Sequence, residues 1–564
     1  MVKRSSIQFH LSLALISLLL LLINTFFIWQ LDIFGLPTFF TVSLLAELLL
    51  LVVFVYNLVF LLKEPFKITV SILISAWRGI LKNQYVERSE RKYPTLFDWI
   101  SRRLATDRPD GLILTTGVII SFFSFVGFLE VAQDVLFKEV FVSVDQRIVN
   151  LIPNIRTLHL TSFFSFITFL ANTQTIIAFT LLTFIFFFMR KQRFAAILFS
   201  LTLFLEELLG LIVKYVVGRV RPEQALSLLS EPSFSFPSTH ALRAVVLFGI
   251  LSYYLFKTFK SHISRLLIIS GYIIIVFLVA ASRVYLGVHY PSDVLASILL
   301  GFSLLSLFIT LSEIQLRYRI LKNAENLASN VLLLVLPPFL IIWSTLLNPF
   351  FIQIRTISPT PHLKVIQGGS DQIVNNLPAK YSETLTGKPM EPISFIYEGS
   401  EDKIKTVFLT HGWYLADPPT LTNTIKTYIV GFQKKQYVTA PVTPSYLDAK
   451  PQDLAFEKPT EVNKLEQRHH TRIWKTNLVL PDGTPIWVGT ASFDKGVEFA
   501  SSIKLPTHQI DPNIDVERDY IVKSLRIANP TYIRIVEPQL GKNASGDPFF
   551  TDGKAGLIDL IGNP

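Results

Sequence analysis

The hydrophobic positions of this chain form long, nearly unbroken runs over the first 350 residues and only short runs after that. A helix that crosses a bilayer needs about 20 consecutive apolar residues. Runs of this kind cover residues 9–31, 39–62, 111–133, 161–189, 194–217, 239–258, 264–282, 293–313 and 328–347. The pattern therefore predicts a polytopic α-helical membrane protein with about nine transmembrane helices.

The pattern changes after about residue 350. Proline and glycine become frequent, and short alternating runs such as TRIWKTNLVL are separated by turn signals such as PDGT. Such spacing is typical of strands joined by turns. We predict a soluble, β-rich α+β domain over 365–564. The preceding parts are then two helices with a basic linker (1–110), a six-helix core (111–313), and a linker with the ninth helix (314–350).

Composition agrees with this division. Hydrophobic residues make up 50% of the chain and charged residues 17%, against about 25% charged in soluble proteins. The chain has no cysteine, which excludes disulfides and thiolate chemistry. Lysine and arginine concentrate in the loops 63–110, 190–193, 257–265 and 317–322. The positive-inside rule then places the N-terminus inside and the C-terminal domain outside. We attribute most of the net charge of +10 to these loops and expect no nucleic-acid partner.

One basic stretch departs from that rule. KYVVGRVRP, which runs from Lys214 to Pro222, lies on an outside loop. Two further polar segments fall at the outer ends of predicted helices: PSTH at 237–240 and SRVYLGVHYPSD at 282–293. Since all three segments lie on one side of the membrane, we expect them to form one site. Its candidate residues are Lys214, Arg221, Ser238, Thr239, His240, Arg283, His289 and Asp293.

These residue types suit phosphoryl transfer. Arginine's planar fork matches phosphate oxygens, and a helix that starts at Ser238 adds an anion-binding terminus. Pro291 fits the first turn of a helix, so Asp293 can reach back to the ring of His289 and fix its tautomer. We expect His289 to attack phosphorus and His240 to serve as acid and base. Lys214, Arg221, Ser238 and Arg283 would hold the phosphate, and no cofactor or metal is expected.

The three segments resemble the motifs of the type-2 phosphatidic acid phosphatase superfamily, K-x6-RP, PSGH and SR-x5-H-x3-D. The first and third match fully, whereas Thr239 replaces the glycine of the second. The resemblance implies a six-helix lipid phosphatase core and the same residue roles. Because threonine tolerates a positive φ poorly, the substitution raises the question of the local backbone conformation.

Other polar residues give weaker signals. Arg243 lies one turn after His240 and is either an extra phosphate contact or a snorkelling side chain, the latter favoured. Glu206 and Glu207 lie inside an apolar run, where we expect polar contacts between helices.

The soluble domain carries a polar cluster. RHHTR at 468–472 and His508 to Asp519, with Gly412–Trp413 and WVGTASFD at 487–494, resemble the LssY-type C-terminal domain. A speculative Zn²⁺ site would take His469, His470, His508 and Asp511; a salt-bridged polar core is the favoured alternative.

The predicted function is metal-independent hydrolysis of a lipid phosphate or diphosphate at the outer face of a bacterial inner membrane. The candidate substrates are undecaprenyl diphosphate, phosphatidylglycerophosphate, phosphatidic acid and lipid A phosphates. The alternatives are a phosphotransferase that uses the same site and a non-catalytic lipid transporter or scaffold. The partners expected are membrane lipids, the lipid phosphate substrate, and a periplasmic ligand or partner for the C-terminal domain.

Overall fold

The computed structural model of the protein describes residues 9–20, 84–320 and 363–560 with short gaps, and single residues elsewhere. It divides into two compact units. The membrane unit comprises Met1–Phe137 and Arg156–Thr356, and the soluble unit comprises Lys138–Ile155 and Ile357–Pro564. The predicted helices over 39–62 and 328–347 and the stretch 321–341 fall largely outside the described residues, so the total of nine helices stays a prediction.

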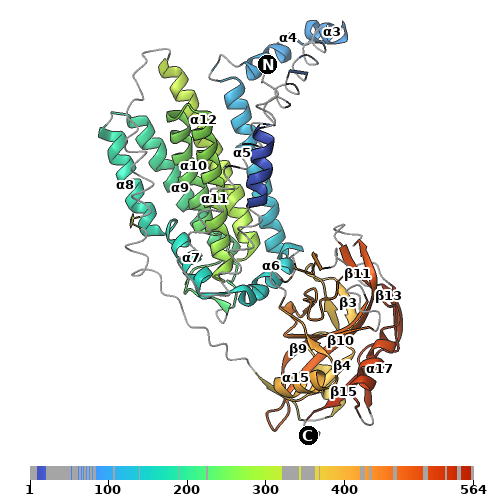
Figure 1. The fold of residues 1–564 in the computed structure, drawn as a ribbon. Helices are drawn as coiled ribbons and strands as arrows, with labels where there is room; N and C mark the ends of the chain where they lie inside the picture. The colour runs from blue at the N-terminus through green and yellow to red at the C-terminus, as the bar shows by residue number, and fades with distance from the viewer. Residues whose placement is uncertain are drawn as a thin grey trace. The chain divides into compact units, whose positions relative to one another are not determined.

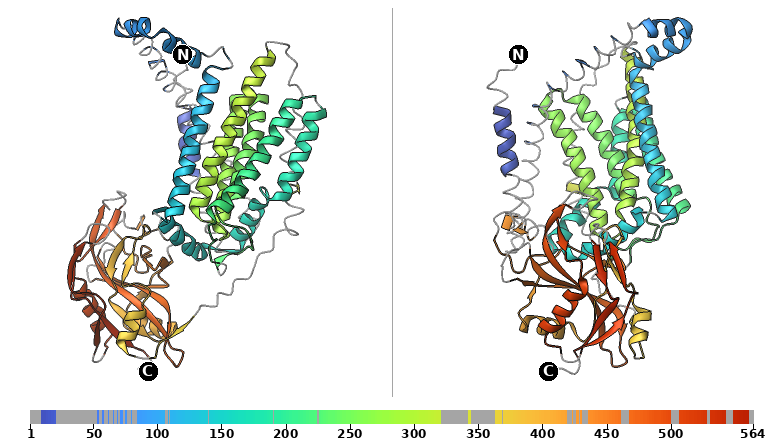
Figure 2. Two further views of the ribbon diagram at one scale, coloured as in Figure 1. Left: turned by 180° about the vertical axis from the view of Figure 1, so that it is seen from behind. Right: turned by 90° about the vertical axis from the view of Figure 1, so that its right-hand side faces the viewer.

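The membrane unit is built from helices that run side by side in Figures 1 and 2. They are α5 (Leu112–Phe137), α7 (Leu158–Phe169), α8 (Thr173–Met189), α9 (Arg193–Val217), α10 (Thr239–Thr258), α11 (His262–Tyr285) and α12 (Pro291–Ile320). Two short helices, α3 (Gln84–Lys92) and α4 (Pro94–Leu104), precede α5. Among the described residues, six helices are long and apolar enough to cross a membrane when α7 and α8 are taken as one span. This confirms the predicted six-helix core.

The predicted run 161–189 is interrupted. A turn at Leu170–Asn172 separates α7 from α8, and the Asn172 side chain accepts a hydrogen bond from the amide of Thr173 (2.8 Å). Apolar length alone could not place this break, because both halves are equally hydrophobic.

Helix α10 forms the centre of the membrane unit. Its side chains from Ala241 to Leu247 are almost entirely buried, whereas Phe122 and Phe123 on α5 are 59% and 65% exposed. Apolar side chains exposed in this way suit lipid contact, since hydrocarbon solvates them without the cost that water would impose. The helix whose N-terminus carries Ser238 and His240 is therefore the most rigidly packed of the set.

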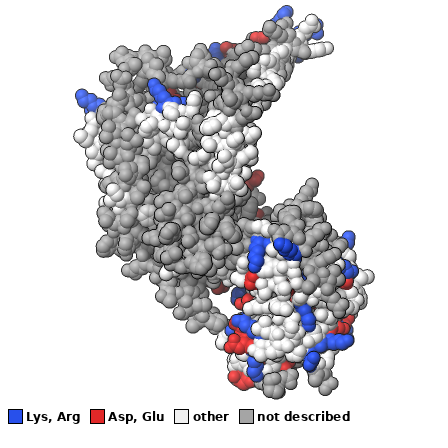
Figure 3. All heavy atoms as spheres, in the orientation of Figure 1, with Lys and Arg blue, Asp and Glu red and all other residues white. Residues whose placement is uncertain are grey.

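The soluble unit is strand-rich, as predicted. Its helices are α6 (Val140–Leu151), η1 (Ile152–Ile155), α14 (Ser370–Asn376), α15 (Glu401–Thr410) and α17 (Ile514–Ser524). The largest sheet has the order β12-β15-β4-β10-β9-β8-β5, with β1 on β9 and β11 on β10. On the face drawn in Figure 3, charges of both signs are spread over this unit, as on a surface in water.

The strands of the large sheet are β1 (Lys364–Val365), β4 (Phe395–Glu398), β5 (Tyr414–Leu415), β8 (Leu454–Pro459), β9 (Arg468–Val479), β10 (Pro485–Phe499), β11 (Pro506–Ile510), β12 (Thr531–Arg534) and β15 (Lys554–Asp559). A second sheet has the order β3-β2-β6-β7, and β13 pairs with β14. These strands are β2 (Tyr381–Glu383), β3 (Pro389–Pro392), β6 (Tyr446–Leu447), β7 (Lys450–Pro451), β13 (Gln539–Lys542) and β14 (Pro548–Thr551).

Candidate active site

The first segment leaves the end of α9. The helix ends at Val217, and Gly218 caps it in the left-handed region at φ +59°. Lys214 lies in the last turn, and its Nζ donates to the carbonyl of Phe234 (2.7 Å). Arg221 therefore reaches the site from the loop that follows α9.

The second segment starts α10. Ser238 is the N-cap, and its amide donates to the backbone carbonyl of Asp293 (3.3 Å). The Ser238 hydroxyl and the Nδ1 of His240 are buried and have no hydrogen-bond partner among the described residues. Buried polar atoms in proteins are almost always paired, so these two atoms suit a bound ligand.

Thr239 takes the first helical position of α10 and does not have a positive φ. A Cβ added to Gly210 of α9 would lie 3.4 Å from the Thr239 methyl group, in ordinary contact. The glycine of α9 thus leaves room for threonine, and the local backbone does not require the motif glycine.

The third segment links α11 to α12. Helix α12 starts at Pro291, as the sequence predicts, and His289 lies just before it. The Nδ1 of His289 is 3.4 Å from Oδ2 of Asp293, and both side chains are at most 1% exposed. Asp293 accepts from the Tyr290 amide (2.9 Å), the Arg219 guanidinium (2.6 Å) and the Ser235 hydroxyl. These three groups hold the aspartate beside the imidazole of His289.

The other ring nitrogen of His289 faces a cation. Nη1 of Arg221 is 3.1 Å from Nε2 of His289 and 2.7 Å from the carbonyl of Val288. With the guanidinium as donor, Nε2 carries the lone pair and Nδ1 carries the proton that faces Asp293. This tautomer presents Nε2 as a nucleophile.

Burial and positive neighbours set the charges of the site. Burial, with Arg221, Arg283 and Lys214 nearby, lowers the pKa of His289 well below its usual 6.5. Burial also lowers the pKa of Arg221 to about 10, an effect that Glu231 partly offsets. The imidazole is therefore neutral at physiological pH, and the guanidinium stays charged.

Glu231 is a member of the site that the motifs did not predict. Its Oε1 accepts from Nη2 of Arg283 (2.8 Å), and its Oε2 is 3.9 Å from Nη2 of Arg221. Burial alone would raise the pKa of this carboxyl, but Arg283 and Arg221 lower it to about 2. A carboxylate thus lies beside both arginines, where a phosphate would bind.

Arg219 was also missed, although it lies inside the first motif. It donates to Asp293 and to Ser292 Oγ (2.8 Å) and lies 4.1 Å from the ring of Tyr290. The sequence did carry a signal for Arg219, because it is a basic residue between Lys214 and Arg221 on an outer loop where the positive-inside rule does not expect lysine or arginine.

Arg243 is engaged elsewhere. Its guanidinium forms a two-pronged ion pair with Glu207, with Nη2 2.9 Å from Oε2, and donates to Thr173 Oγ1 (3.1 Å). The polar helix contact expected of Glu207 is present, and Arg243 neither snorkels nor is free to bind phosphate. Its role as an extra phosphate contact stays a prediction that this arrangement does not favour.

Three of the four residues of the speculative metal site, His469, His470 and Asp511, do not come together, and the side chain of the fourth, His508, lies outside the described part of the structure. His469 and His470 point to opposite faces of β9: Nδ1 of His469 lies 2.9 Å from Glu517, and His470 lies beside Asp494. Asp511 pairs with Lys495 (2.8 Å). Among the described residues, no group of three His, Cys, Asp or Glu side chains is placed to hold a metal. Strand alternation explains the separation, because neighbouring residues face opposite sides.

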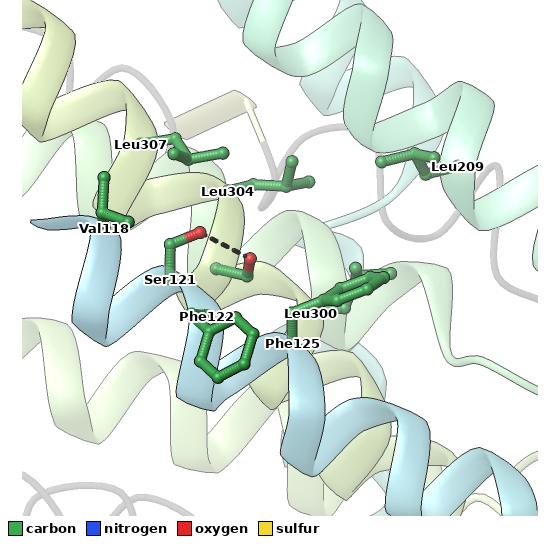
Figure 4. Close-up of a pocket in the computed structure, with 9 residues that line it drawn as sticks. Val118, Ser121, Phe122, Phe125, Leu209, Leu300, Leu304 and Leu307 are labelled. Atoms are coloured by element: carbon green, nitrogen blue, oxygen red, sulfur yellow. Dashed lines mark hydrogen bonds between the residues drawn. The ribbon is translucent and has the colours of Figure 1, made fainter.

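An apolar groove lies along the membrane-facing side of the core (Figure 4). It has a volume of about 350 Å³ between α5, α9 and α12, and the hydroxyls of Ser121 and Ser303 form a hydrogen bond (2.9 Å) in its wall. Leu209 and Leu300 line it, on the helices that carry Lys214 and Asp293. At 1.5 Å per residue, they lie about 7 Å and 10 Å along these helices from the two site residues.

Comparison with known proteins identifies two families in this chain. Residues 195–317 match the PAP2 superfamily, and residues 374–555 match the LssY C-terminus family. The chain is a PAP2 superfamily member with a C-terminal LssY domain. Both resemblances expected from the sequence are confirmed.

Several relatives of this PAP2 protein are known. Phosphatidylglycerophosphatase B of Bacillus subtilis (strain 168) is 38% identical over 136 residues, which are 24% of this chain and 65% of that relative. The crystal structure of the first transmembrane PAP2 type phosphatidylglycerolphosphate phosphatase from Bacillus subtilis has 31% identity and a TM-score of 0.32, covering 34% of this chain and 96% of that one. The crystal structure of Aquifex aeolicus LpxE has 28% identity and a TM-score of 0.23, covering 29% and 92%.

Proposed function

We propose that this PAP2 protein hydrolyses a lipid phosphate through a phosphohistidine on His289. The observation that carries the proposal is the position of His289, with Asp293 at one ring nitrogen and Arg221 at the other. One partner fixes the tautomer, and the other marks the place of the phosphate.

In the first step, the substrate phosphate displaces the Glu231 carboxylate and binds to the guanidinium groups of Arg221 and Arg283. Nε2 of His289 then attacks phosphorus, the P–N bond forms, and the bond from phosphorus to the lipid oxygen breaks. His240 enters this step protonated, gives its proton to the leaving oxygen and becomes neutral. Asp293 stabilises the positive charge that develops on the His289 ring.

In the second step, His240 takes a proton from water, whose oxygen attacks phosphorus. The P–N bond breaks, inorganic phosphate leaves, and His289 is again neutral. Lys214, Arg221, Arg283 and the N-terminus of α10 at Ser238 stabilise the charge on the phosphoryl oxygens in both steps.

The membrane setting supports a lipid substrate. The site lies at the ends of α9, α10, α11 and α12, and the groove of Figure 4 runs along two of these helices within reach of an acyl chain. The name of the Bacillus subtilis relative makes phosphatidylglycerophosphate the first substrate to test. From the distribution of lysine and arginine among the loops, we propose that the site lies at the outer face of a bacterial inner membrane.

The test is phosphate release by purified protein in detergent from a panel of lipid phosphates: phosphatidylglycerophosphate, phosphatidic acid, undecaprenyl diphosphate and lipid A. We expect release that EDTA does not reduce and that His289→Ala abolishes in a protein of unchanged thermal stability. Activity lost with chelator and restored by Zn²⁺ would contradict the metal-free mechanism. Transfer of phosphate to an added alcohol in excess of release would favour a phosphotransferase.

A further inference from the structure

Arg156 binds two backbone carbonyls beside the site. It lies between η1 and α7, and its Nη2 donates to the carbonyls of Leu226 (2.8 Å) and Tyr285 (3.0 Å). Its Nε also donates to Tyr285 (3.2 Å). Leu226 belongs to the loop that carries Glu231, and Tyr285 ends α11, four residues before His289. One guanidinium thus joins the two loops from which the site is built.

The joint between these loops is tight. Gly287 has φ +74°, and a Cβ on it would lie 2.5 Å from the carbonyl oxygen of Leu226 and 2.9 Å from Nη2 of Arg156. The amide of Leu228 also donates to the carbonyl of Leu286 (2.9 Å). A side chain at position 287 would force the loops apart, so the spacing depends on both glycine and arginine.

The segment that follows Arg156 contacts the side-chain hydroxyl of Tyr285, the residue whose carbonyl Arg156 binds. The hydroxyl of Tyr285 accepts from the amide of Thr157 (3.2 Å) and lies 3.1 Å from Thr161 Oγ1. Segment 156–161 therefore contacts both the backbone and the ring of Tyr285. A shift of this segment would move the end of α11, and with it the loop that carries His289.

We propose that Arg156 is a positioning residue for phosphoryl transfer. The proposal rests on the proposed function of His289. Arg156 keeps the loop 286–290 in register, so that Nε2 of His289 stays aligned with the guanidinium of Arg221, which is itself bound to Val288. A misplacement of about 1 Å can cost 100-fold in rate.

The first experiment replaces the guanidinium. Arg156→Ala should lower kcat by about 10- to 100-fold with KM changed less than about 3-fold, because alignment and not affinity is lost. Arg156→Lys should recover only part of the rate, since an ammonium cannot bridge two carbonyls as a fork does. Arg265→Ala is the matched control: Nε of Arg265 donates to the carbonyl of Phe259 (2.9 Å), away from the site. Equal kcat in Arg156→Ala and wild type would overturn the proposal.

Hydrogen exchange separates this proposal from the proposed function. The amides of Val288 and His289 donate to the carbonyl of Arg283 (3.2 and 3.3 Å). Arg156→Ala should speed their exchange, whether or not the protein releases phosphate. Unchanged exchange would overturn the positioning role, whereas faster exchange in a protein that hydrolyses no lipid phosphate would overturn only the proposed function.

Discussion

Two buried histidine–aspartate pairs in this protein have nearly the same geometry and different surroundings. Nδ1 of His289 lies 3.4 Å from Asp293 in the membrane unit, and Nδ1 of His470 lies 3.4 Å from Asp494 in the soluble unit. All four side chains are at most 4% exposed. The pair alone therefore does not define a catalytic site.

The charges around each pair differ. Four cations, on Lys214, Arg219, Arg221 and Arg283, accompany two carboxylates, on Glu231 and Asp293. Around the second pair, Arg468 lies between two carboxylates, 2.6 Å from Glu457 and 3.4 Å from Asp494. The excess of positive charge suits an anionic ligand, whereas the second set resembles a buried ionic network.

The histidines respond to these surroundings. Burial lowers the pKa of His470 to about 4 even though Asp494 opposes the change, and burial together with three cations lowers the pKa of His289 well below its usual value. Both rings are neutral at pH 7. Of the two rings, only that of His289 has a guanidinium at its second nitrogen, and this difference supports the role of nucleophile that we propose for His289.

The same substitution in both pairs should give the largest contrast. Asp293→Asn removes the acceptor that fixes the His289 tautomer, and should lower kcat on the order of 1,000-fold or more. Asp494→Asn should leave kcat within about 2-fold while lowering the free energy of unfolding by about 1–3 kcal/mol, because it disturbs a buried network. Phosphate release and thermal unfolding of both variants are the measurements. Comparable losses of kcat in the two would remove the distinction.

The role of the excess cations can be tested with Arg221→Lys. The substitution keeps the positive charge but removes the planar guanidinium, so one ammonium group replaces two N–H donors of fixed direction. We expect kcat/KM to fall by about 100-fold. Arg468→Lys, in the network of the soluble unit, is the matched control and should retain activity. An Arg221→Lys variant with near wild-type kcat/KM would show that charge alone suffices.

Glu231 should compete with the substrate phosphate. Its pKa of about 2 keeps it ionised at every pH used in an assay. Glu231→Gln removes the competing charge, yet leaves a carbonyl to accept from Arg283. Orthovanadate, a phosphate analogue, should then inhibit about tenfold more tightly, which corresponds to about 1.4 kcal/mol. Weaker inhibition in the variant would mean that Glu231 organises the arginines and does not compete with the substrate.

Restoring the motif glycine should have the smallest effect. Because Thr239 is helical and packs against the space left by Gly210, Thr239→Gly should change kcat by less than about 3-fold, the main cost being glycine's added backbone freedom. Gly210→Ala probes the same contact from the other helix. A large gain in rate with glycine would show that threonine limits the chemistry.

The sequence predicted the six-helix core, the strand-rich domain and the start of α12, because apolar length, turn signals and Pro291 depend on local physics. It did not predict that residues 138–155 belong to the soluble unit, since Arg147 and Glu383 are 236 positions apart. Glu231 was missed for the same reason, because its partner Arg283 lies 52 positions away along the chain. Arg219 was missed although it belongs to the basic stretch 214–222 that departs from the positive-inside rule.

Trapping of the phosphorylated enzyme tests the central claim most directly. Wild type and His240→Gln are mixed with a ³²P-labelled lipid phosphate that the wild type hydrolyses, then quenched in alkali, where a phosphohistidine survives. The account predicts label on the peptide that contains His289 in the wild type and none in His289→Ala. In His240→Gln the label should form more slowly and, once formed, persist longer, because His240 acts in both steps. Label on another residue, or wild-type turnover without a labelled enzyme, would contradict His289 as the nucleophile.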